Sequence, residues 1–104
     1  MGTNIPDKVL KIINDLGIPP DILESVGDVF EHGRKKRQQK NGEWKDLTAK
    51  NQKLYDIYYH KAIHHLVRGY ENINPLDADS NQHHFVHVIV LSMIMLNMWN
   101  NAQK

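Results

Sequence analysis

The chain has 104 residues, of which 40% are hydrophobic and 24% are charged, and this length predicts a single domain over residues 1–104 with one core. The formal net charge is +1 with histidine neutral, which argues against a nucleic-acid partner. Because there is no cysteine, disulfides and thiolate metal sites are excluded, and a reducing, cytoplasmic location is expected.

Two amphipathic helices are predicted in the first third of the chain. The first, capped by Asn4, begins after Pro6 and stops at Gly17. The second begins at Pro20, and Gly33 is expected to weaken or end it. Apolar residues recur three and four positions apart, which predicts one buried face in the second helix. The apolar positions are Val9, Leu10, Ile12, Ile13 and Leu16, then Ile22, Leu23, Val26, Val29 and Phe30.

A basic segment follows at residues 34–42, with five positive charges and no apolar side chain. This composition is typical of a frayed helix end or a loop, and Asn41 with Gly42 predicts a turn. Trp44 stands alone in this polar surrounding. We therefore expect it to pin the segment to the body of the protein.

Two longer helices are predicted in the second half, at about residues 48–70 and 82–100, separated by a break around Pro75. The last helix is apolar around most of its circumference, which predicts a place at the centre of a bundle or at an oligomer interface. No strand series is visible, so the fold class is an all-α bundle of about four helices. The apolar side of the third helix is expected to be Tyr55, Tyr59, Ala62, Ile63, Leu66 and Tyr70.

The most apolar stretch of the last helix is residues 85–99. It has fifteen residues and polar interruptions, whereas a membrane span needs about 20, so no membrane partner is predicted. Three short helices cannot cover all of this helix, and self-association, most simply as a dimer, is expected. The residues that need a partner are Met93, Ile94, Met95, Met98 and Trp99.

Seven histidines are unusual for a chain of this length. On a helical wheel of the third predicted helix, His60 and His64 lie on the side that faces solvent, and His65 lies beside the apolar stripe. His84 and His87 are three residues apart and share one face of the last helix.

The loop before the last helix contains Asp77 and Asp79. These carboxylates and the imidazoles of His65, His84 and His87 are the ligand types of a divalent-metal site. In the alternative, the histidines have structural roles and the aspartates cap the last helix.

Several blocks occur in a recognisable order. The first is Val-Phe-Glu-His-Gly at residues 29–33 with two lysines, and Trp44 follows. Next come His-His-Leu at 64–66, Gly-Tyr-Glu at 69–71, Asp-Ala-Asp-Ser-Asn at 77–81 and His-His-Phe-Val-His at 83–87. Residues 26–98, about seventy of the 104, thereby resemble the phage-encoded dATP/dGTP diphosphohydrolase N-terminal domain family, whose members are small α-helical proteins.

The chain departs from the family pattern at several positions. His64 stands at the arginine of the family's Arg-His step, Asp79 at a glutamate and Asn81 at a glycine. One extra residue separates Gly69 from Glu71. Asparagine can still adopt the left-handed conformation that the loop glycine allows.

The resemblance implies hydrolysis of a purine deoxynucleoside triphosphate to a monophosphate and pyrophosphate in the cytoplasm of a phage-infected bacterium. It implies a divalent metal ion as cofactor, with Asp79 or Glu71 orienting water. The metal ligands would be His65, Asp77, His84 and His87, and the substrate-binding residues Lys35, Lys36, Trp44 and His64. Arg34 and Arg37 could add attraction for the polyphosphate, unless the basic segment is merely solvated.

Two other functions stay open. The chain could be a non-catalytic helical phage accessory protein that binds a nucleotide or a host protein. A nucleic-acid-binding role for the basic segment fits less well, since no recognition helix carries it. Convergence of the histidines and an aspartate distinguishes the hydrolase from the binding protein.

Overall fold

Helices make up most of the chain in the structure, a computed structural model that describes residues 7–37 and 43–104. The predicted Asn4 cap and the turn at residues 41–42 lie outside these ranges. The elements in chain order are α1 (Asp7–Leu16), α2 (Pro20–Lys36), the 3₁₀ turn η1 (Glu43–Asp46), α3 (Gln52–Glu71) and α4 (His84–Ala102). The predicted all-α bundle of about four helices is therefore confirmed.

The helix ends follow from local chemistry. Asn51 caps α3, since its side chain accepts a hydrogen bond from the amide of Leu54, and Asn72 ends the helix in the left-handed conformation, with φ 56°. The His83 ring likewise accepts from the amide of Phe85 at the start of α4.

Of the two effects expected of Gly33, an end of the helix is wrong, because α2 continues through this residue to Lys36. A glycine inside a helix costs about 1 kcal/mol relative to alanine. Arg34 pairs with Glu31 one turn earlier, and the basic residues of the last turn interact favourably with the helix dipole. These interactions offset the glycine.

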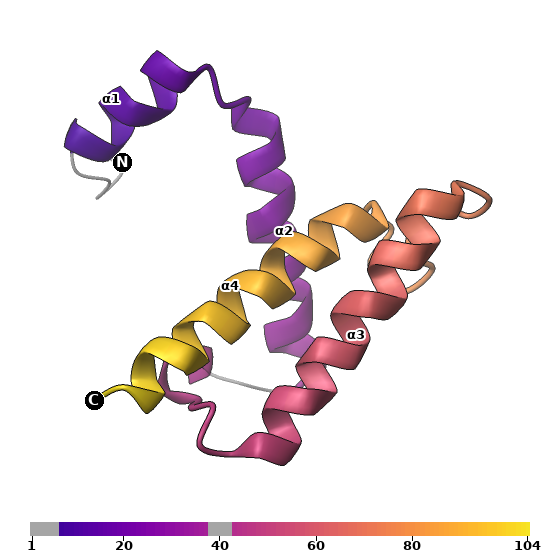
Figure 1. Ribbon diagram of the computed structural model, residues 1–104. Coiled ribbons are helices and arrows are strands. Elements are labelled where there is room, and N and C mark those ends of the chain that lie inside the picture. The colour runs from indigo at the N-terminus through magenta and orange to yellow at the C-terminus, as the bar shows by residue number, and fades with distance from the viewer. Residues whose placement is uncertain (1–6, 38–42) are drawn as a thin grey trace.

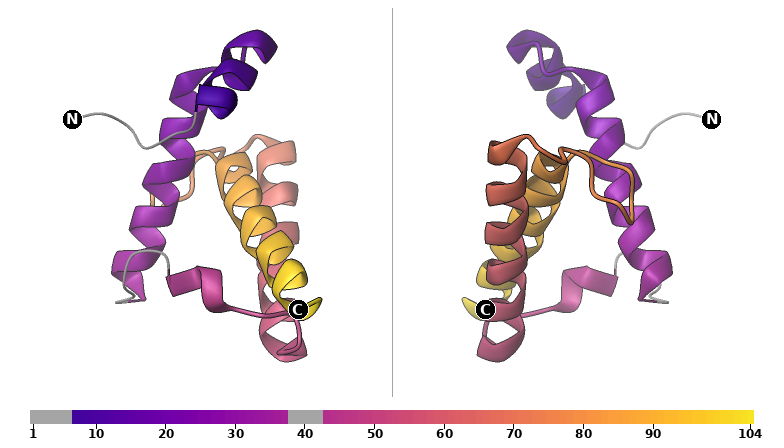
Figure 2. Two further views of the ribbon diagram at one scale, coloured as in Figure 1. Left: turned by 90° about the vertical axis from the view of Figure 1, so that its left-hand side faces the viewer. Right: turned by 90° about the vertical axis from the view of Figure 1, so that its right-hand side faces the viewer.

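α4 is the central helix, because α2, α3 and η1 all pack on it (Figure 1). Within the described ranges, α2 and α3 do not pack on each other, and Figure 2 shows them on different sides of α4. The core between these elements consists of Val26, Val29, Tyr58, Ala62, Val90, Leu91, Ile94 and Met98.

The segment after the basic run is fixed to α4 by polar contacts and to α2 by an aromatic contact. Asn97 and Asn101 donate to the carbonyl of Lys45 at 3.0 and 2.7 Å. The ring of Trp44 stacks on Phe30, with centroids 4.9 Å apart. Trp44 therefore packs against the body of the protein, whereas residues 38–42 of the segment that it was expected to pin lie outside the described ranges.

The buried face of α3 differs from the predicted stripe. Tyr58, Ala62 and Gly69 are buried there, and only Ala62 was predicted. Four of the predicted residues are exposed instead: Tyr59, Ile63, Leu66 and Tyr70. The contact face contains a glycine and His65, so it is less apolar in composition than the stripe beside it.

The outer parts of the bundle keep apolar surface exposed. Ile94 and Met98 are in the core, whereas Met93 and Trp99 are exposed, so only part of the set expected to need a partner lacks one. α1 packs on none of the other described elements, and most of its apolar residues are exposed, namely Val9, Leu10, Ile12 and Leu16. Ile22 and Leu23, predicted on a buried face, are exposed. They belong to the N-terminal part of α2, and this end of the helix extends past α4 (Figure 1).

α4 is longer than the fifteen-residue stretch considered above. With 19 residues and a mean hydropathy of 1.3, it is long and apolar enough to cross a membrane. Central helices of water-soluble proteins meet the same criterion.

Candidate functional site

A pocket of about 530 Å³ is lined by residues of α2, α3 and α4 and of the loop before α4. This volume is in the range of small-molecule sites. Its apolar part comes from Val29, Phe30, Tyr58, Val90, Leu91 and Ile94. Its polar part comes from His32, Lys36, Arg37, Lys61, His64, His65, Asp77, Asp79 and His87.

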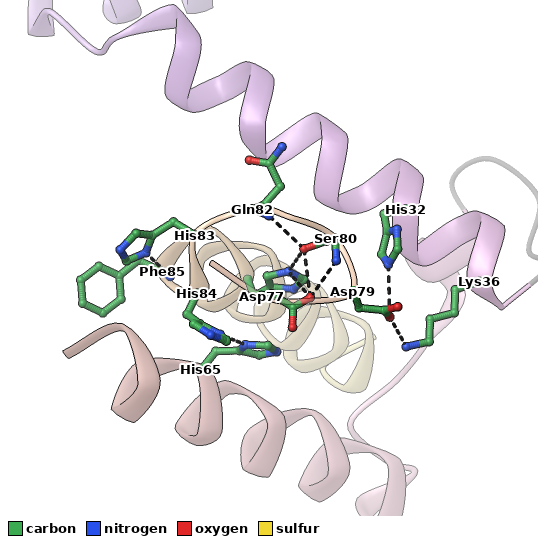
Figure 3. Close-up of polar contacts among 11 residues, drawn as sticks. His32, Lys36, His65, Asp77, Asp79, Ser80, Gln82, His83, His84 and Phe85 are labelled. Carbon is green, nitrogen blue, oxygen red and sulfur yellow. Dashed lines mark hydrogen bonds and ion pairs between the residues drawn. The ribbon is translucent and has the colours of Figure 1, made fainter. Parts of the chain in front are cut away.

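A group of metal-ligand side chains forms at one end of α3 and α4. His65 and His84 approach with their Nδ1 atoms 2.8 Å apart (Figure 3). One ligand atom each from His65, Asp77 and His84 lies within 4.8 Å of the others. We call these three residues the His-Asp-His cluster.

The loop between α3 and α4 closes on itself and so brings Asp77 to the start of α4. The amide of Asp77 donates to the carbonyl of Gln82 at 2.8 Å, and that of His84 to Pro75 at 2.9 Å. Asn81 turns the chain with φ 60°, the left-handed conformation that the sequence allowed.

Ser80 fixes the carboxylate of Asp77. Its amide and its hydroxyl both donate to Asp77 Oδ2, each at 3.0 Å. The Ser80 hydroxyl also lies 2.6 Å from His87 Nε2, and this nitrogen is 3.5 Å from Asp77 Oδ2. The His87 ring stacks on His65, with centroids 4.4 Å apart. The structure thus places His87, a predicted metal ligand, against Ser80 beside the cluster.

The protonation states suit metal ligation. Burial and the neighbouring His87 and His84 lower the pKa of His65 to about 4, and burial lowers the pKa of His87. Although burial opposes it, hydrogen bonding from Ser80 lowers the pKa of Asp77. Near neutral pH the site therefore offers neutral imidazoles at His65 and His87 and a charged carboxylate at Asp77, the forms that bind metals.

We expect the folded protein to lose stability as the pH falls from about 6.5 to about 4. His65 has a lowered pKa in the folded state, so the unfolded chain binds more protons in this window. The expected loss of unfolding free energy is on the order of 1 kcal/mol after solvent screening, measured by urea denaturation without metal. His65→Asn should flatten the dependence. A wild-type stability that stays level across this window would contradict the prediction.

Three other predicted site residues line the pocket: Lys36, His64 and Asp79. The His64 ring is 6.3 Å from that of His84, between centroids. Asp79 Oδ2 lies 2.5 Å from Lys36 Nζ and 3.4 Å from His32 Nε2 (Figure 3). Asp79 is therefore engaged by α2 rather than by the His-Asp-His cluster.

The remaining predicted residues lie outside the pocket lining. Lys35 points to solvent, with 71% of its side chain exposed. Glu71 is the exposed last residue of α3, and Trp44 packs on Phe30. The structure does not bring these three together with the cluster.

Sequence reasoning gave no role to three residues of the pocket region, His32, Lys61 and Ser80. Helical spacing could have found the first, since His32 and Lys36 are three and seven residues after the buried Val29 and thus share its face. No local signal identifies Lys61. The role of Ser80 follows from the folded shape of its loop.

A scan against protein-family models found no match, and searches of curated proteins and of solved structures found none either. None of these comparisons identifies the diphosphohydrolase family that was expected from the sequence. A diphosphohydrolase activity of this chain is therefore a proposal.

Proposed function

We propose that the protein is a divalent-metal-dependent hydrolase that converts purine deoxynucleoside triphosphates to monophosphates and pyrophosphate. The observation that carries the proposal is the convergence of His65, Asp77 and His84 beside a pocket with cationic residues on two walls. His65 and Asp77 line this pocket, and the buried His84 lies behind His65. The purine substrate and the phage-infected cytoplasm come from the sequence resemblance.

The donor set fits a divalent metal ion. His65, His84 and Asp77 offer two imidazole nitrogens and one carboxylate oxygen, a combination typical of catalytic zinc, manganese or cobalt sites. Such an ion, when bound, supplies charge neutralisation at a phosphate and activation of water. Ser80 holds Asp77 and contacts His87, which keeps the carboxylate beside His65 and His84.

The other pocket residues would bind the substrate. Lys36 of α2 and Lys61 of α3 lie on opposite walls, so positive charge faces a polyphosphate from both sides, and the His64 ring lines the pocket on the α3 side. The apolar part, with Tyr58 and Leu91, offers a surface for a purine base and excludes water. In this arrangement Lys35, Trp44 and Glu71 have no direct contact with substrate.

The test is incubation of the purified protein with each dNTP and Mg²⁺, Mn²⁺, Co²⁺ or Zn²⁺, with detection of released pyrophosphate and dNMP. We expect turnover of dATP or dGTP that stops when EDTA is added. Absence of turnover with every metal in a folded sample would contradict the hydrolase. Nucleotide binding without turnover would instead support the non-catalytic accessory protein.

Self-association belongs to the same proposal. The outer face of α4 carries large apolar side chains, each at least 40% exposed: Phe85, Ile89, Met93, Leu96 and Trp99. Pairing two copies on this face would cover it. Light scattering should give twice the chain mass of 12.1 kDa, and a value near 12.1 kDa would contradict the dimer.

A further inference from the structure

An anion-binding position is already built into the edge of the pocket. His32 and Lys36, one turn apart on α2, both reach the same oxygen, Asp79 Oδ2, at 3.4 and 2.5 Å (Figure 3). All three residues line the pocket. Two donors from one helix face thus converge on a single anionic oxygen.

The charges of the pocket favour replacement of the Asp79 carboxylate by an anionic ligand. Its lining includes three cationic side chains (Lys36, Arg37 and Lys61) and two carboxylates (Asp77 and Asp79). Asp77 belongs to the His-Asp-His cluster. The partners of Asp79 among the described residues are Lys36 and His32, whose side chains also bind phosphate. If Asp79 turns outward, the pocket gains positive charge where a polyphosphate would enter.

We propose that His32 and Lys36 form a subsite for one phosphate group of a polyphosphate ligand, and that the Asp79 carboxylate holds this subsite until phosphate displaces it. The subsite deepens the proposed function and rests on it only for the identity of the physiological ligand. Binding of an inorganic polyphosphate requires neither a metal ion nor catalysis.

The Asp79 contacts are weak enough to be displaced. Asp79 is 54% exposed and Lys36 is 65% exposed, and ion pairs at such exposure contribute little to stability. A phosphate carries more charge than a carboxylate and offers three acceptor oxygens. Phosphate can therefore compete for the same donors.

Displacement of the Asp79 carboxylate by phosphate would also affect the His-Asp-His cluster, because Asp79 and Asp77 belong to the same loop. Asp79 lies between Asp77, a cluster residue, and Ser80, which fixes Asp77 by two hydrogen bonds. Movement of Asp79 must therefore be absorbed by the residues that position the Asp77 carboxylate. The subsite and the His-Asp-His cluster share one short loop.

The experiment is calorimetric titration of the full chain with inorganic tripolyphosphate in EDTA, with wild type and Asp79→Asn compared. We expect the variant to bind at least about threefold more tightly, because the competing carboxylate is removed. Lys36→Gln should bind tripolyphosphate more weakly than wild type. The double variant Lys36→Gln/Asp79→Asn should lose the gain seen in Asp79→Asn and also bind more weakly than wild type. Equal or weaker binding by Asp79→Asn would overturn the proposal.

A matched control separates local competition from net charge. Asp28→Asn removes the same charge from an exposed position of α2 outside the pocket lining, and its affinity should stay at the wild-type value. If Asp28→Asn gained as much as Asp79→Asn, the effect would be general and the subsite would be refuted. Circular dichroism should show equal helix content in all variants.

A second titration, with dATP in EDTA, tests whether the subsite accepts a phosphate group of a nucleotide as well as one of free polyphosphate. The same gain in Asp79→Asn with both ligands supports a phosphate subsite, and a gain with neither refutes it. The hydrolase fails independently, by absence of turnover with metal. A tripolyphosphate gain in a protein without turnover would thus keep the subsite and remove the enzyme.

Discussion

His84→Ala is expected to weaken binding of Zn²⁺ or Co²⁺ by more than about 100-fold, since loss of even an indirect partner of a metal ligand reduces affinity by 10- to 100-fold. His84 is 6% exposed, and its Nδ1 atom lies 2.8 Å from that of His65. The substitution leaves two of the three cluster residues. Titration against a chromophoric chelator measures the loss directly, without any assay of turnover.

The control for His84 is another histidine of the same bundle. His60 lies on the exposed side of α3, with Nδ1 2.7 Å from the carbonyl of Asp56 and no part in the cluster. His60→Ala should therefore leave metal affinity unchanged.

Because His84 is buried, a variant of more similar volume, His84→Gln, separates loss of the ligand from loss of the fold. It should keep the wild-type helix content and still bind metal weakly. Wild-type affinity in a folded His84 variant would show that the His65–His84 contact is structural.

Sequence reasoning gave the number and approximate bounds of the helices, because caps and breakers are local. Asn51 and Asn72 cap the two ends of α3 by contacts with residues of the same helix, so their effect does not depend on tertiary packing. The buried face of α3 was not predictable in the same way. Two stripes lie on this helix, and the one in contact with α4 contains Gly69 and His65, whose fit depends on the partner surface.

The candidate site likewise combines contacts that local sequence predicts with contacts that depend on how the helices pack. The proximity of His65, Asp77 and His84 was predictable, because a loop joins the two helices at that end. The pairing of Asp79 with Lys36 was not, because the two are 43 residues apart and meet only once α2 packs on α4. The local pattern likewise could not show that Ser80 turns back onto His87.

Gly69→Ala should lower the free energy of unfolding by about 1–3 kcal/mol, the usual cost of overpacking a helix contact. A Cβ atom at position 69 would lie 2.4 Å from Phe85 Cε1 and 2.5 Å from Cδ1. α3 would have to move away from α4, or the Phe85 ring would have to turn outward. Chemical denaturation monitored by circular dichroism measures the change.

Gly27→Ala is the matched control, because it makes the same substitution inside α2, where a Cβ atom meets nothing within 4 Å. Removal of this glycine should raise stability by about 0.4–1 kcal/mol. The two variants should therefore change stability in opposite directions. If Gly69→Ala were as stable as wild type, α3 and α4 would not approach closely at this point.

The contact at Gly69 also bears on the site, since Phe85 follows His84 at the start of α4. A shift of this turn to accommodate a methyl group would draw His84 away from His65. Gly69→Ala should then bind Zn²⁺ more weakly than Gly27→Ala does, even when both are fully folded. In the double variant Gly69→Ala/Phe85→Leu, the smaller side chain should restore part of both stability and metal affinity. Restored stability without restored affinity would show that the helix contact supports the fold but does not position the cluster.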